Sequence, residues 1–137
     1  NSIHGNTKEA VLELEKILKE NGAKKVVLSD LSRDDMAETI EDAFKYDKLI
    51  IASPTYDAGL FPTTEKFLRH LKHKNYQNRK IALIENGSWA PMAAKCMKEI
   101  ISELKDITLV EKVVTIKTKM TEENRKEMIE LAKEILI

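Results

Sequence analysis

The sequence predicts an α/β fold: a doubly wound parallel sheet of five strands in the order 2-1-3-4-5, with helices on both faces. Two observations lead to this prediction. Apolar runs without polar alternation, typical of strands covered on both faces, alternate along the chain with amphipathic helical stripes. The connections between them are short, as in parallel sheets whose strands are joined by helices. At 137 residues, the chain is expected to form a single domain, 1–137.

Five helices are expected where apolar residues recur every three or four positions. Their stripes are, in chain order, Ala10–Leu18, Met36–Phe44, Phe67–Leu71, Ala93–Leu104 and Met128–Leu136. Asn21 and Gly22 end the first helix, since this pair is typical of a C-cap. Ser32 or Asp34 begins the second and Thr121 caps the last, because their side chains accept hydrogen bonds from free helical N–H groups.

Four apolar runs predict strands, the last of them broken near Glu111 and Lys112. These runs are Val26–Leu28, Leu49–Ala52, Ile81–Ile84 and a strand within Thr108–Ile116. The strand that should precede the first helix is absent from the sequence. In the order 2-1-3-4-5 that strand is central, so we expect it just upstream of Asn1 as roughly four to seven mostly apolar residues.

Charge, hydropathy and cysteine content argue against several classes of function. Basic and acidic residues balance at 23 each, which gives no electrostatic attraction to nucleic acid or to an anionic membrane. No apolar run is long enough to span a bilayer. The single cysteine, Cys96, cannot form an internal disulfide, and it fits a reducing cytoplasm. We therefore expect a cytoplasmic protein that binds neither nucleic acid nor membranes.

The segment before the first helix has the composition of a phosphate-binding loop. It reads Ser2, Ile3, His4, Gly5, Asn6 and Thr7. Free N–H groups and the positive end of the helix dipole meet at such a helix start, and a glycine lets the backbone approach an anion. The loop holds no Lys or Arg, so neutral donors would hold the phosphate. The alternative is an ordinary helix start, with Asn6 as N-cap and Glu9 three residues on.

Two further loops lie at the same expected edge, because the carboxyl ends of parallel strands meet there. The residues singled out in the first are Pro54, Thr55, Tyr56, Asp57 and Gly59; those in the second are Asn86, Gly87, Ser88 and Trp89. Tyr56 and Trp89 suit stacking on a flat ligand. The alternative is that these aromatic residues only cover the end of the sheet.

These loops resemble those of the flavodoxin-like family, and the resemblance covers essentially the whole chain. The segment 2–7 resembles the family's FMN-phosphate loop, with His4 in place of the usual hydroxyl residue. The segments 53–56 and 86–89 resemble the two loops that hold the isoalloxazine ring. More narrowly, Ser-Pro-Thr followed by Phe61-Pro62, and Asn78–Ile81 before Gly-Ser-Trp, is similar to the flavodoxin domain of A-type flavoproteins.

The resemblance implies FMN as cofactor and electron transfer as function. In A-type flavoproteins this domain is joined to a di-iron domain that reduces oxygen or nitric oxide, and a rubredoxin-like protein donates electrons. Transfer across a subunit contact then implies a homo-oligomer, and the chain acts as an oxidoreductase only within the larger protein. A free-standing carrier and an NAD(P)H:quinone reductase remain alternatives. A phospho-receiver module is disfavoured, because Ser53 stands where the acceptor Asp belongs.

Overall fold

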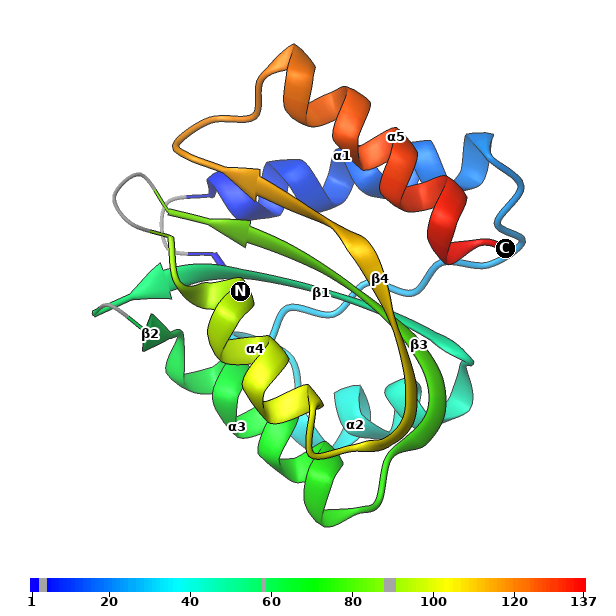
Figure 1. Cartoon of the computed structure of the whole chain (residues 1–137), viewed down its shortest axis with the longest axis vertical. Coiled ribbons are helices and arrows are strands. Elements are labelled where there is room, and N and C mark those ends of the chain that lie inside the picture. Colours follow the sequence, from blue (N-terminus) through cyan, green and yellow to red (C-terminus); the bar gives the residue numbers. More distant parts are fainter. Residues whose placement is uncertain (3–4, 58, 88–90) are drawn as a thin grey trace.

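The computed structural model describes residues 1–2, 5–57, 59–87 and 91–137. Helices and strands alternate along the chain as the sequence predicts (Figure 1). The helices are α1 (Asn6–Glu20), α2 (Met36–Lys45), α3 (Pro62–His73), α4 (Ala93–Ile101) and α5 (Glu122–Ile135). The strands are β1 (Lys48–Tyr56), β2 (Gly59–Leu60), β3 (Gln77–Asn86) and β4 (Lys105–Ile116).

The sheet has the order β2-β1-β3-β4 over the described residues. β1 runs parallel to β3, with Lys48 opposite Lys80 and Pro54 opposite Asn86, and β3 runs parallel to β4. These three strands are the predicted third, fourth and fifth strands, side by side as expected. The order also fits a missing first strand. The short β2, which the sequence did not predict, turns back antiparallel onto the end of β1.

The prediction of a strand at Val26–Leu28 is wrong. Residues 23–30 form no strand, although several of them line the same cavity as β1. In the order 2-1-3-4-5 this segment would pair only with the first strand. Because no such strand lies beside it in the described structure, its backbone has no ladder to join, and Val27 and Leu28 stay partly exposed.

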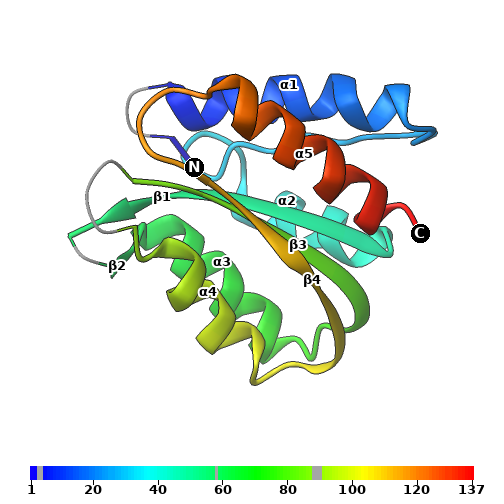
Figure 2. The ribbon, with the colours of Figure 1, turned by 45° about the horizontal axis from the view of Figure 1, so that its top comes forward.

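Helices cover both faces of the sheet (Figure 2). One core lies between the sheet and α1 and α5, and the other between the sheet and α2, α3 and α4. Successive β3 residues alternate between the two: Ile81 and Leu83 belong to one core, Ala82 and Ile84 to the other. No helix within the described ranges is long and apolar enough to cross a membrane.

Several element ends differ from the predictions by a few residues. Gly5, not Asn6, is the N-cap of α1, and Asp35, not Ser32 or Asp34, caps α2 by accepting two backbone N–H groups. The predicted C-cap at Asn21 and N-cap at Thr121 are confirmed. β4 begins at Lys105, earlier than expected, and runs to Ile116 without the predicted break near Glu111 and Lys112. Only its pairing with β3 shifts in register, between Leu109 and Val113.

Candidate functional site

The three candidate loops leave the same edge of the sheet. Pro54 of β1 lies opposite Asn86 of β3, so the loops that follow these strands start side by side. The backbone nitrogen of Asn1 donates a hydrogen bond to the Ala52 carbonyl of β1 (2.9 Å), which brings the segment before α1 to the same edge. The start of α1 lies near the carboxyl ends of β1 and β3 in both ribbon views (Figures 1 and 2).

The start of α1 presents backbone N–H donors at this edge. Gly5 is the N-cap, with a left-handed φ of 84° that suits glycine, and no side-chain cap is found among the described residues. The Ser2 hydroxyl accepts the Gly5 N–H (3.0 Å), which folds the loop back on itself. Thr7 is almost covered, at 2 % exposed. Ile3 and His4 lie outside the described residues.

Asn1 ties this loop to the rest of the edge. Its side-chain carbonyl accepts hydrogen bonds from the hydroxyls of Thr63 (2.8 Å) and Thr64 at the start of α3, and its amide donates to Ser32 (2.8 Å). The Thr64 hydroxyl also lies 3.1 Å from that of Ser53, and both of these side chains are fully buried.

The loop after β1 is a tight hairpin. Thr55 pairs with Leu60 and Tyr56 with Gly59, while Asp57 has a positive φ of 48°. The Tyr56 ring is 50 % exposed and packs edge-on against Phe61, with centroids 5.4 Å apart. An aromatic ring that is half exposed at the carboxyl edge of the sheet is available for stacking on a planar ligand.

Thr55 links the loop after β1 to the loop after β3. Its hydroxyl oxygen accepts the backbone N–H groups of Met92 (2.9 Å) and Ala93 (3.2 Å), at the start of α4. Gly87 packs closely against Thr55 and Pro91. A Cβ there would lie 3.0 Å from the Thr55 hydroxyl oxygen and 3.2 Å from Pro91 Cα.

Glu85 holds the base of the third loop. One carboxylate oxygen accepts the N–H of Ala94 in the first turn of α4 (3.0 Å), and the other accepts the Thr115 hydroxyl of β4 (2.7 Å). The Gly87 N–H donates to the Ile116 carbonyl (2.9 Å), which fixes the loop to β4 as well. Ser88 and Trp89, predicted as site residues, lie outside the described residues.

The described site residues that the sequence predicts lie on three segments that reach the same edge of the sheet. These are Ser2, Gly5, Asn6, Thr7, Pro54, Thr55, Tyr56, Asp57, Gly59, Asn86 and Gly87. Sequence reasoning missed Thr64 and Glu85, and it placed Asn1 and Ser53 in the candidate loops without a role; all four hold the loops in place. For Glu85 a signal existed, since it is a charged residue directly after the apolar run Ile81–Ile84. Thr64 gives no such signal, because its role depends on contacts distant in sequence.

No protein-family model and no curated protein sequence matches this chain. Solved structures do. Rubredoxin:oxygen oxidoreductase from the anaerobe Desulfovibrio gigas aligns over 97 % of this chain with a TM-score of 0.90 and 17 % identity. A flavodoxin from the domain Archaea aligns over 98 % (TM-score 0.82, 20 % identity), and a variant of the flavo di-iron protein of Thermotoga maritima over 99 % (TM-score 0.77, 26 % identity).

The extent of these matches differs between the two kinds of protein. The chain spans about a third of the two larger proteins, 33 % and 34 %, but 91 % of the archaeal flavodoxin. It has the flavodoxin-like fold, close to that of the flavodoxin part of flavodiiron proteins.

Proposed function

We propose that this flavodoxin-like chain binds one FMN across its three edge loops and serves as an electron-transfer domain. One observation carries the proposal: the start of α1, where no side chain of the described residues caps the helix, lies at the edge where β1 and β3 end. That edge of an open parallel sheet is where ligands of such folds bind. When bound, FMN supplies the redox chemistry, and the protein holds it and tunes its potentials.

The FMN phosphate is assigned to the loop before α1. Its donor set is neutral: the N–H groups of the first helical turn, with the side chains of Ser2, Asn6 and Thr7. These groups fit a phosphate, because backbone donors and the helix dipole stabilise an anion without a Lys or Arg. Ile3 and His4 complete the loop in this proposal.

The flavin ring is assigned to the other two loops. Their residues are Pro54, Thr55, Tyr56, Asp57 and Gly59 after β1, and Asn86, Gly87, Ser88 and Trp89 after β3. Main-chain groups of these loops would bind the polar edge of the ring, while Tyr56 and Trp89 would pack on its faces. Such an apolar aromatic wall disfavours additional negative charge on the flavin and thereby favours one-electron transfer.

Titration of the flavin-free chain with FMN and with riboflavin tests the proposal. The two flavins share the ring and differ in the phosphate, so FMN should bind more tightly. Thr7→Ala should weaken FMN binding by about 1–3 kcal/mol, the usual loss for a hydrogen bond to a charged group, and leave riboflavin binding unchanged. Equal affinity of the wild-type chain for both flavins would remove the phosphate assignment.

The finer role that we propose is the flavodoxin part of an A-type flavoprotein in the cytoplasm. A di-iron domain would receive its electrons across a subunit contact, and a rubredoxin-like protein would supply them. Two observations support this role: the likeness to two proteins of this kind, and the 26 % identity with one of them. With FMN bound, this chain alone should accept electrons from reduced rubredoxin but reduce little oxygen or nitric oxide.

A free-standing flavodoxin-like carrier is the second candidate, because the chain covers 91 % of an archaeal flavodoxin. The coding sequence upstream of Asn1 separates the two. A domain with a His-x-His/Glu-x-Asp metal motif supports the flavoprotein, and a gene that begins just before the missing strand supports the carrier. Steady turnover of a quinone with NAD(P)H would instead indicate a quinone reductase.

A further inference from the structure

Two neighbouring helices, α2 and α3, carry opposite charges. The segment 34–42 holds five acidic residues and no basic one: Asp34, Asp35, Glu38, Glu41 and Asp42. The segment 66–74 holds four Lys or Arg residues, two His and no acidic residue: Lys66, Arg69, His70, Lys72, His73 and Lys74. Because the whole chain has no net charge, this separation belongs to these two helices and not to the overall composition.

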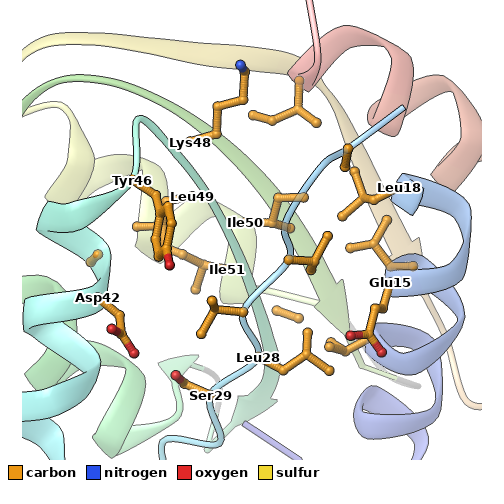
Figure 3. A pocket seen from close by; sticks show the side chains of 18 of the residues that line it. Glu15, Leu18, Leu28, Ser29, Asp42, Tyr46, Lys48, Leu49, Ile50 and Ile51 are labelled. Atoms are coloured by element: carbon orange, nitrogen blue, oxygen red, sulfur yellow. The ribbon is translucent and has the colours of Figure 1, made fainter. Parts of the chain in front are cut away.

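α2 and α3 lie side by side on one face of the sheet (Figures 1 and 2). Their apolar residues share one core, where Ile40 and Ala43 of α2 belong to the same cluster as Leu68 of α3. The charged residues lie on the outer sides of the helices, where all except Asp42 and His70 are exposed. Asp42 also lines the cavity beside β1 (Figure 3).

The opposite charges of α2 and α3 do not pair with each other. No ion pair joins the two helices over residues 5–57 and 59–87. The pairs on α3 are made elsewhere: Arg69 with Glu65 (3.6 Å) and Lys72 with Glu103 (2.6 Å). Within the described structure, no ion pair involves Lys66, Lys74, Glu38 or Glu41. These four exposed side chains are therefore available to a partner.

We propose that the charged surface of α2 and α3 is a contact between two copies of this chain, in which α2 of each copy faces α3 of the other. A two-fold axis that runs between the two helices produces this arrangement, because half a turn places the acidic helix of one copy over the basic helix of its partner. Both signs lie next to each other in nearly equal number, so the surface is complementary to itself. A uniformly acidic or uniformly basic partner would be repelled by half of it.

A contact of this kind is weak and depends on salt, because exposed ion pairs are individually weak and are screened. Sedimentation of the chain at increasing concentration measures it, and the measurement needs no flavin. The dissociation constant of the dimer should rise on the order of tenfold between about 0.01 M and about 1 M salt, since the screening length falls from about 30 Å to about 3 Å. A chain that stays monomeric at low salt, or a dimer that salt does not weaken, would overturn the proposal.

Charge reversal on α3 tests the basic half of the contact. Lys66→Glu/Lys74→Glu should abolish the dimer at low salt. Lys16→Glu/Lys133→Glu is the matched control, because it changes the net charge equally at exposed positions of α1 and α5 that no described ion pair uses. The control should keep the dimer, and equal loss in both variants would overturn the proposal.

Charge reversal on α2 tests the acidic half in the same way. Glu38→Lys/Glu41→Lys should abolish the dimer, and Glu20→Lys/Glu111→Lys, which lies on α1 and β4, should keep it. A carbodiimide, which joins a carboxylate to an amine as an amide, then locates the contact in a mixture of unlabelled and ¹⁵N-labelled chains. Cross-links between differently labelled chains should join segment 34–42 to segment 66–74. A dimer whose cross-links join other segments would overturn the proposal.

Discussion

The Thr55 hydroxyl joins the loop after β1 to the start of α4, and the substitution Thr55→Val tests whether this hydroxyl positions the candidate site. Valine has the shape of threonine but no acceptor, so the N–H groups of Met92 and Ala93 lose their partner. Loss of a helix-capping acceptor costs about 1–2 kcal/mol, and here one oxygen serves two donors, which favours the upper end of that range.

Thr55→Ser is the matched control, because it keeps the hydroxyl and removes only a methyl group. Denaturant unfolding of the two variants gives the difference in unfolding free energy, and FMN titration gives the effect on the site. The Val variant should be less stable than the Ser variant by about 1–2 kcal/mol and should bind FMN up to about tenfold more weakly. Equal stability and equal FMN affinity of the two variants would refute the positioning role of this hydroxyl.

Three further predictions concern Gly87, Tyr76 and Trp89. Gly87→Ala should cost about 1–3 kcal/mol in unfolding free energy and weaken FMN binding, because its Cβ would crowd Thr55 and Pro91. Gly59→Ala should leave the unfolding free energy nearly unchanged, because its Cβ would meet nothing closer than 3.7 Å. Tyr76→Phe should stabilise the protein at pH 7 by about 1–3 kcal/mol, because the buried hydroxyl has no partner among the described residues. Burial raises the pKa of Tyr76 to about 12, so between pH 10 and 12 the unfolded chain releases this proton and the folded chain keeps it. Stability should therefore fall with rising pH in that window, and a fall of the same size in Tyr76→Phe would contradict the assignment. Trp89 fluorescence should be strongly quenched when FMN binds; an unchanged signal at saturating FMN would indicate that this residue only covers the sheet end.

Local patterns predicted the helices and three strands because these elements depend on apolar spacing along the chain, and the order of the three strands followed from their alternation with helices. The run Val26–Leu28 shows the limit of such patterns. Its composition suits a strand, but a strand also needs a partner, and in the described structure the space beside it is a cavity. The start of α1 was misjudged by one residue because Gly5 caps through its backbone conformation, which side-chain capping rules do not detect.

The position of the candidate site could be predicted from the sequence, but the contacts that hold it could not. Loops that follow parallel strands share an edge whatever their sequence, so the meeting of segments 54–57 and 86–87 could be expected. The contacts that hold them could not, since the bonds from Thr55 to Met92 and from Asn1 to Thr63 join residues 37 and 62 positions apart. Such contacts depend on tertiary packing and leave no local pattern in the sequence.

Backbone amide shifts recorded by NMR during an FMN titration test the three-loop site most directly. FMN should shift the amides of Gly5, Asn6 and Thr7 together with those of Tyr56 and Gly87, and riboflavin should shift only those of Tyr56 and Gly87. Shifts confined to residues 24–29 and 48–52 would instead place the flavin in the cavity beside β1, and would contradict binding at the edge loops.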